Sequence, residues 1–224
     1  MKDLSLLIVG GGSGLGALLA RMAVDDGAAK VGIIDIDPAA AEAALEPARA
    51  KGLPTALAKC DIQVGPQCHA AFGAVAATLG RVDTLINCAA IYPRRAILEI
   101  TDAEWDASNG INVKGTYHMM VAAIRHMQPQ PPKAEVRGRI VNLTSVDAFK
   151  AHPQNAHYAA TKAAVVSLTR SVAQHVAGDG ILVNSVAPAG MARSAPGISG
   201  SWRSWPRQVL WAAERSRRRS PNGC

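Results

Sequence analysis

The stretch VGGGSGLG, residues 9–16, continues directly from an uncharged apolar run that begins at Leu4. Gly10, Gly14 and Gly16 give the spacing G-x-x-x-G-x-G at the point where a strand would turn into a helix. Glycine permits positive φ and lets backbone N–H groups approach a pyrophosphate, whose charge is favoured by the N-terminus of the following helix. Taken alone, the same spacing also fits a tight strand–helix connection that binds nothing. The stretch therefore predicts a strand–turn–helix unit and raises the possibility of a nucleotide site, which needs a second signal.

Apolar runs of strand length alternate with longer segments rich in alanine and leucine, which predicts βαβ units. The expected strands are near-continuous apolar runs, typical of a parallel sheet with helices on both faces, and span residues 4–9, 30–35, 55–59, 83–87, 138–143 and 181–186. Helices are expected at roughly 14–26, 38–51, 66–79, 104–128 and 156–178. The prolines of QPQPPK, residues 128–133, end the fourth helix. The fold class is therefore α/β, a Rossmann-type doubly wound parallel sheet.

Charge divides the chain into two parts. The 224 residues are 49% hydrophobic, enough for one sizeable core, and we expect one domain over residues 1–194. Residues 195–224 hold six arginines and one glutamate, and so carry +5 of the net charge of +7. We interpret this segment as an atypical basic, disordered tail, because basic blocks are often simply solvated. The nearly neutral body argues against a nucleic-acid partner.

Neither a metal site nor a membrane span is indicated. The four cysteines form no C-x-x-C pair, and the nearest two histidines, His152 and His157, do not have the i, i+4 spacing of two ligands on one helix face. Reduced thiols are therefore expected. Glycines interrupt the first apolar run, and no run reaches the ~20 apolar residues of a membrane helix. We expect a cytoplasmic protein without a bound metal.

Asp35 supplies the second signal for a nucleotide site. It ends the second expected strand, 19 positions after Gly16, close to the ~20-residue offset at which a carboxylate meets the adenosine ribose hydroxyls. Asp37, directly before Pro38, fits the alternative role of helix N-cap better than Asp35 does. A carboxylate at this place repels a 2′-phosphate, and its neighbours in the turn carry no positive charge. The sequence thus favours NAD over NADP.

Tyr158 and Lys162, in YAATK at residues 158–162, form the second constellation, with Ser145 thirteen residues before the tyrosine. Residues at i and i+4 share a helix face, so the ammonium group can lie near the phenol. A tyrosine with pKa ~10 is a poor base at neutral pH, whereas a neighbouring lysine and an oxidised nicotinamide both favour the phenolate. In isolation such a spacing is far more often an ordinary pair on a helix surface, because i, i+4 neighbours are common.

In combination, these motifs resemble the classical short-chain dehydrogenase/reductase family over about residues 4–194. The matching segments agree in order and spacing: the glycine turn, Asp35, Asp61–Ile62 after the third strand, INCAA at 86–90, Asn112 in INVKG, Ser145, Tyr158, Lys162 and APAG at 187–190.

The resemblance implies an oxidoreductase that moves a hydride between NAD(H) and a secondary alcohol or carbonyl substrate. By it, Tyr158 would take or return the alcohol proton, and Ser145 would steady the developing oxyanion. Lys162 would lower the tyrosine pKa and hold the nicotinamide ribose, and Asn112 would position a water that connects this lysine to solvent. The family also implies a homodimer or homotetramer.

The resemblance also implies a set of cofactor-binding residues. Asp61 and Ile62 would contact adenine, and Asn87 with Ala89 would line the cofactor beside the fourth strand. The full expected set is Gly10, Gly12, Ser13, Gly14, Leu15, Gly16, Asp35, Ile36, Asp61, Ile62, Asn87, Ala89, Tyr158, Lys162, Pro188 and Gly190.

The chain departs from the family pattern near its end. Ala189 replaces the glycine of the family's Pro-Gly, and Arg193 stands at or near the place of a threonine that usually bonds the carboxamide. Residues 195–224 resemble neither the family's substrate-covering segment nor its last strand, which we expect to be lacking. This leaves an alternative function: a cofactor-binding but catalytically impaired protein that lacks its substrate lid and acts as an interaction partner.

Overall fold

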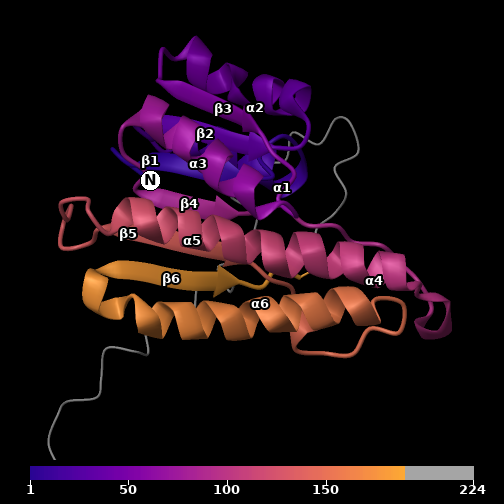
Figure 1. Ribbon diagram of the computed structural model, residues 1–224. Helices are drawn as coiled ribbons and strands as arrows, with labels where there is room; N and C mark the ends of the chain where they lie inside the picture. The colour runs from indigo at the N-terminus through magenta and orange to yellow at the C-terminus, as the bar shows by residue number, and fades with distance from the viewer. Residues whose placement is uncertain (190–224) are drawn as a thin grey trace, which may run out of the picture. The chain divides into compact units, whose positions relative to one another are not determined.

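Six parallel strands form the central sheet of the computed structural model, in which residues 1–189 are described (Figure 1). The strands are β1 (Ser5–Val9), β2 (Lys30–Asp35), β3 (Thr55–Lys59), β4 (Thr84–Asn87), β5 (Gly138–Leu143) and β6 (Ile181–Val186). Their order across the sheet is β3-β2-β1-β4-β5-β6. The order reverses between β1 and β4, and in open α/β sheets ligands bind outside the carboxyl ends of the strands at such a switch point.

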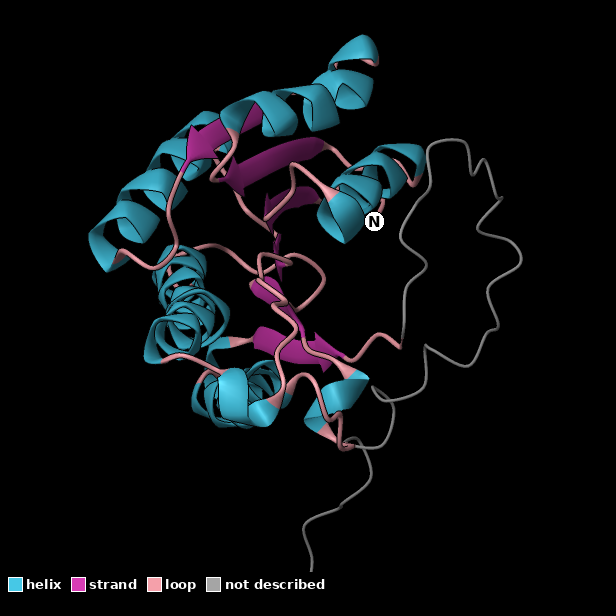
Figure 2. Cartoon of the chain, turned by 90° about the vertical axis from the view of Figure 1, so that its right-hand side faces the viewer, coloured by secondary structure: helices cyan, strands magenta, loops and turns pink. Residues whose placement is uncertain are grey.

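Helices cover both faces of this sheet (Figure 2). The α-helices are α1 (Gly14–Asp25), α2 (Pro38–Ala50), α3 (Gly65–Leu79), α4 (Asp102–Ser108), α5 (Thr116–Met127) and α6 (Ala156–His175). Short helical turns are η1 (Ile97–Glu99), η2 (Asn109–Gly115), η3 (Val146–Ala148) and η4 (Ala177–Asp179). The predicted α/β class, a doubly wound parallel sheet, is confirmed.

Strand β1 shows why the sheet needs helices on both sides. All five of its residues are buried, and successive side chains point to opposite faces. Leu6 and Ile8 join the core beneath α1 and α2, whereas Leu7 and Val9 join the core beneath α3 and α5. A continuous apolar run is therefore required at this place, because both faces of the strand are covered.

The expected fourth helix is interrupted. Its first part is α4, its last part is α5, and between them Asn109–Gly115 widens into a π-helical turn. Within the turn the Thr116 hydroxyl donates to the Asn112 backbone carbonyl at 2.8 Å. Such turns recur at functional sites, and this one carries Asn112. As predicted, α5 ends at Met127, directly before the proline-rich loop.

Several expectations fall on residues 190–224. The boundary at residue 194, the basic tail, the missing last strand, Gly190 and Arg193 all lie outside the described residues. Within the described part of the chain, β6 is an edge strand of the sheet. A search of the described helices finds none that is both long and apolar enough to cross a membrane.

Candidate functional site

The predicted site residues come together at the carboxyl ends of the strands, around the switch point. The backbone N–H groups of Cys88 and Ala89, which follow β4, both donate to the Val9 carbonyl, at 2.8 and 2.9 Å. On the other side of β1, the N–H of Gly10 donates to the Ile34 carbonyl at 2.8 Å. The glycine turn is therefore fixed to both neighbouring strands.

Three glycines of the turn have distinct steric reasons to be glycine. Gly10 has φ +74°, and a Cβ on it would lie 2.5 Å from the backbone nitrogen of Ala89. A Cβ on Gly16 would lie 2.0 Å from the Gly10 carbonyl oxygen, so α1 can approach the turn only without a side chain there. Gly14 has φ +53° and open space around its missing Cβ. The turn is thus closely packed at Gly10 and Gly16 and open to solvent or a ligand at Gly14.

The first turn of α1 faces this open space. Ser13 is its N-cap residue, with an extended backbone and no side-chain capping hydrogen bond. Ser13 and Gly14 are exposed, and Leu15 is half-buried. The first N–H groups of a helix have no partner within it and attract anions. Backbone donors for a pyrophosphate are therefore present where the sequence predicted them.

Asp35 lies directly against the glycine turn. Its Oδ2 accepts a hydrogen bond from the Gly12 N–H at 2.7 Å, and its Oδ1 accepts one from the Asp37 N–H at 3.0 Å. Asp37 itself caps α2, as predicted, by accepting from Ala39 and Ala40. Ile36 is 61% exposed. The two backbone donors fix the Asp35 carboxylate beside the turn and leave further lone pairs on each oxygen for a ligand hydroxyl.

Three other predicted cofactor residues use their side chains within the protein. Asp61 accepts from the Gln63 N–H at 3.0 Å, and the side chain of Ile62 is buried in the core. The Nδ2 of Asn87 donates to Asn142 Oδ1 at 2.8 Å, and Asn87 Oδ1 is buried without a partner. Any contact of Ile62 with a cofactor must therefore come mainly from the backbone, whereas Asn87 keeps one free side-chain acceptor.

Ser145 and Tyr158 meet at the carboxyl end of β5. Ser145 precedes η3, where its Oγ accepts from the Asp147 N–H at 3.1 Å, and Tyr158 lies in the first turn of α6. Burial raises the pKa of Tyr158, its hydrogen bond with Ser145 lowers this pKa, and Asp147 and Tyr92 raise it. Without a bound cofactor, the rise in the Tyr158 pKa that burial causes exceeds the lowering that we expected from Lys162. The phenol is thus held protonated at neutral pH.

Lys162 lies one helical turn after Tyr158 and is 4% exposed. Its Nζ is 5.6 Å from the centroid of the Tyr158 ring and donates to the Leu143 carbonyl at 2.7 Å. Burial lowers the pKa of Lys162 to about 8. Burial also raises the pKa of the nearby Cys88 thiol to about 12, an effect that the lysine charge opposes. A lysine with this pKa can lose or gain a proton near neutral pH.

Asn112 is fully buried in η2, and its side chain is completely used within the protein. Its Oδ1 accepts from the Ile91 N–H at 2.9 Å, and its Nδ2 donates to the Ile91 carbonyl at 3.1 Å and to Thr161 Oγ1 at 3.0 Å. The side chain therefore connects the segment after β4 to α6. A water would have to bind the backbone carbonyl of Asn112, which has a second lone pair besides the one used by Thr116.

Comparison with known proteins agrees with this geometry. A model of the short chain dehydrogenase family matches residues 5–199. The chain belongs to the short-chain dehydrogenase family. Among its relatives, the short-chain reductase protein NovJ of Streptomyces niveus is 33% identical over 186 residues, which are 81% of this chain and 67% of the relative. The probable galactose dehydrogenase GalD of Rhizobium meliloti is 32% identical over 84% of this chain and 72% of the relative.

The fold of this short-chain dehydrogenase is also found in solved structures. A xylitol dehydrogenase with bound NAD+ superposes with a TM-score of 0.79 at 26% identity, over 88% of this chain and 72% of that one. The family consists of oxidoreductases that bind NAD(P), and the names of two similar proteins give different substrates, galactose and xylitol. Membership therefore establishes the reaction class and leaves the substrate open.

The sequence reasoning missed two residues beside Tyr158 in this short-chain dehydrogenase. Tyr92 packs edge to face on Tyr158, with ring centroids 4.5 Å apart, and the Asn155 side chain donates to the Tyr92 hydroxyl. A tyrosine five positions after the end of β4, in a chain with only three tyrosines, was a usable signal for the first. Asn155 directly precedes a predicted helix, so the sequence suggests only helix capping for it and no contact with Tyr92.

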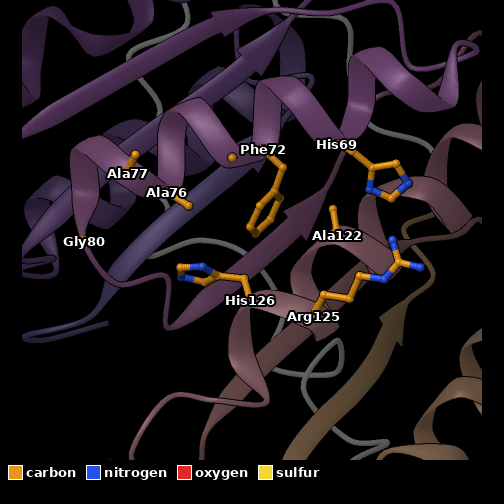
Figure 3. A pocket seen from close by; sticks show the side chains of 9 residues that line it. His69, Phe72, Ala76, Ala77, Gly80, Ala122, Arg125 and His126 are labelled. Carbon is orange, nitrogen blue, oxygen red and sulfur yellow. The ribbon is translucent and has the colours of Figure 1, made fainter.

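A separate hollow of about 660 Å³ lies between α3 and α5, away from these residues (Figure 3). His69 and Phe72 line it from α3, and Arg125 and His126 line it from α5. In Figure 3 the side chains of His69 and Arg125 approach each other, and the ring of His126 lies beside Phe72. None of the predicted catalytic residues lines this hollow, so we do not assign the oxidoreductase reaction to it.

Pro188 completes the site from β6. Its carbonyl accepts from the Val146 N–H at 3.2 Å, which ties the segment after β6 to η3, next to Ser145. All predicted site residues within the described range thus lie at the carboxyl ends of the strands.

Proposed function

We propose that this short-chain dehydrogenase moves a hydride between NAD(H) and a secondary alcohol or the corresponding carbonyl compound, with Ser145, Tyr158, Lys162 and Asn112 as its active site. The observation that carries the proposal is the position of Tyr158. Ser145 lies near enough to its phenol to lower the Tyr158 pKa, and Lys162 Nζ lies 5.6 Å from its ring. Both residues lie at the carboxyl ends of the strands, where the glycine turn also lies.

The residues of the turn fit a dinucleotide. Gly14 leaves open space, and the uncapped first turn of α1 offers N–H groups to the pyrophosphate. Asp35 would accept the ribose hydroxyls, Asp61 and Ile62 would flank adenine, and Ala89 would border the cofactor. A bound nicotinamide supplies or accepts the hydride.

The proton is handled by the protein. In reduction the neutral phenol of Tyr158 donates its proton to the developing alkoxide, and its raised pKa keeps it protonated for this step. The Ser145 hydroxyl donates a hydrogen bond to the same oxygen and stabilises its negative charge. In oxidation Tyr158 must first lose its proton, and a protonated Lys162 nearby favours the phenolate.

Lys162 and Asn112 would connect Tyr158 to solvent. With a pKa of about 8, Lys162 can pass a proton on near neutral pH. The carbonyl of Asn112 would hold the water that receives this proton. Members of the family are generally oligomeric, and we propose a homodimer or homotetramer that acts on a small-molecule substrate in the cytoplasm.

A substrate screen tests the proposal. Secondary alcohols, polyols and 3-oxoacyl thioesters should be offered with NAD+ or NADH, and turnover is read from the absorbance of NADH. We expect turnover of at least one class. Binding of NADH without turnover of any of them would support the alternative, a cofactor-binding protein that lacks catalysis.

Asp35 should determine the choice of cofactor. We expect NADH to bind about 10–100-fold more tightly than NADPH, because the fixed carboxylate repels a 2′-phosphate in a partly solvated place. Asp35→Ala should remove most of this difference, mainly by weakening NADH. Titration of both cofactors by quenching of protein fluorescence gives the two values of Kd.

Asp37→Asn is the matched control for Asp35→Ala. It removes a charge two residues away, while an asparagine oxygen can still cap α2. The cofactor preference should not change in this variant. A preference of the parent protein for NADPH would contradict the role of Asp35 and direct attention to Lys59, which pairs with Asp35 in the register of β2 and β3.

A further inference from the structure

A segment after β4, residues 91–95, lies against the helix that carries Tyr158. Its start is held by Asn112, which bonds both the N–H and the carbonyl of Ile91. Its end is held by the Arg95 N–H, which donates to the Gln154 carbonyl at 3.0 Å. Tyr92 lies between these two fixed points, so its position is set by the backbone on both sides.

Tyr92 contacts Tyr158 in a defined geometry. The two rings meet at an interplanar angle of 81° with centroids 4.5 Å apart, the edge-to-face arrangement that aromatic pairs prefer. Such pairs contribute about 0.5–1.5 kcal/mol beyond the area that they bury. Ser145 also lies near enough to the Tyr158 phenol to lower its pKa, and Lys162 Nζ lies 5.6 Å from the centroid of its ring. Tyr92 is therefore a third contact that limits rotation of the Tyr158 ring.

Asn155 fixes the Tyr92 ring through its hydroxyl group. Its Nδ2 donates to the Tyr92 hydroxyl, and its side chain is fully buried. Asn155 lies three residues before Tyr158, and its carbonyl accepts the first hydrogen bond of α6 from Ala159 at 2.8 Å. The contacts thus form a closed loop, in which Tyr92 touches Tyr158 and is bonded to the same helical turn.

We propose that Tyr92, held by Asn155, is a positioning residue that keeps the phenol of Tyr158 directed at Ser145 and the substrate oxygen. The inference rests on the proposed role of Tyr158 as acid and base. It goes beyond that role, because it assigns a function to a pair of residues that contribute no proton themselves.

The charged and titratable groups around Tyr158 determine how the loss of Tyr92 would change the Tyr158 pKa. Asp147 on η3 raises the pKa of Tyr158, as do burial and Tyr92, and Lys162 approaches the ring from α6. Arg94 lies over the outer side of Tyr92, with its Cζ 5.6 Å from that ring. Removing the Tyr92 ring should admit water to Tyr158, which lowers its pKa, whereas loss of the orientation toward Ser145 would raise it. Because burial is the larger of the two effects, the net change in the Tyr158 pKa should be a decrease.

Alkaline titration of the intact protein tests this without a substrate. Ultraviolet absorbance follows tyrosinate formation, and the chain has only three tyrosines. Subtraction of the titration of the same protein with Tyr158→Phe added isolates Tyr158 in the parent and in each variant. Tyr92→Ala should shift the Tyr158 titration to lower pH. Tyr92→Phe keeps the ring and should shift it less. Circular dichroism at each pH confirms that the variants remain folded.

Tyr117→Phe is the matched control. Tyr117 is 45% exposed and Tyr92 is 46% exposed, but Tyr117 lies on α5 beside His118. Its removal should leave the titration of Tyr158 unchanged. An unchanged Tyr158 titration in both Tyr92 variants would overturn the proposal. If Tyr92→Ala does not fold, Tyr92→Phe and Asn155→Ala decide the question by the same shift.

Kinetics supply a second readout once a substrate is known. We expect Tyr92→Ala to lower kcat about tenfold or more and to change KM less, because misplacement of a catalytic group acts on the chemical step. A change in KM alone would overturn the proposal and make Tyr92 a substrate-binding residue. A shifted titration in a protein without turnover would instead support the positioning contact and contradict the proposed reaction.

Discussion

Replacing Tyr158 with phenylalanine is expected to lower kcat by about 10²–10⁴-fold, the range that a positioned acid–base group contributes. The substitution deletes one oxygen and retains the ring that packs on Tyr92. Ser145 keeps its bond with the Asp147 N–H, so the local structure should persist. The Kd for NADH should change less than about twofold, because the glycine turn and Asp35 are untouched.

Steady-state kinetics and a fluorescence titration of NADH, made on the same preparation, separate the two effects. Tyr117→Phe makes the same chemical change at an exposed tyrosine and should retain full activity. If the Tyr158 variant keeps more than about a tenth of the parent kcat, Tyr158 is not the acid and base of the reaction.

The strands and the glycine turn could be predicted because local sequence determines them. A run such as LLIV in β1 has every residue buried, and a helix-covered parallel strand requires this pattern. Gly14 is explained by its positive φ and Gly16 by its close approach to the nearby Gly10 carbonyl, whereas the approach of Ala89 to Gly10 is distant in sequence. Tyr158 and Lys162 are one helical turn apart, so their proximity also follows from sequence.

Side-chain partners distant in sequence could not be predicted. Asn112 and Asn87 were expected at the cofactor or at a water, yet their side chains bond Ile91, Thr161 and Asn142. The π-helical turn that carries Asn112 has no periodicity that distinguishes it from an α-helix. Tyr92 and Asn155 are 63 positions apart and meet only because the crossover from β4 to β5 brings the segments after these two neighbouring strands together.

The direction of the Tyr158 pKa shift could not be predicted from the sequence either. Sequence indicates a lysine one turn away, which favours the phenolate. It does not indicate how deeply the phenol is buried, or that the lysine ammonium donates to the Leu143 carbonyl. Burial has the larger effect and raises the pKa of Tyr158.

Lys162→Met is expected to lower activity by at least about 10²-fold and to increase the free energy of unfolding at pH 7. The activity loss follows from removal of the charge that favours the phenolate and of the proposed ribose contact. The stability gain follows from burial, which lowers the pKa of Lys162 from 10.5 to about 8, a shift that corresponds to a penalty of about 3 kcal/mol for the charged folded state. Loss of the bond to Leu143 offsets about 1 kcal/mol of this gain.

The pH dependence identifies the lysine as the source of this penalty. Below pH 8 Lys162 is protonated in both the folded and the unfolded protein, so the penalty is complete and constant. Between about pH 8 and pH 10 the folded protein releases this proton while the unfolded chain retains it. Because the unfolded state then binds more protons, the stability of the parent rises with pH. The advantage of the methionine variant should therefore decrease through this range.

Urea unfolding of the parent and the variant at several pH values measures this difference, and the difference cancels other groups that titrate in both proteins. Lys30→Met is the matched control, since Lys30 Nζ also donates to a backbone carbonyl, that of Leu79, at 2.6 Å, but far from Tyr158 in the fold. It should retain both the activity and the parent's rise in stability with pH. The contrary result is a Lys162→Met protein that is less stable than the parent at pH 7, with no change in the difference up to pH 10. It would show that burial of the charged Lys162 does not destabilise the folded protein. The lysine would then be an ordinary structural residue, and the conflict between stability and catalysis at this position would not exist.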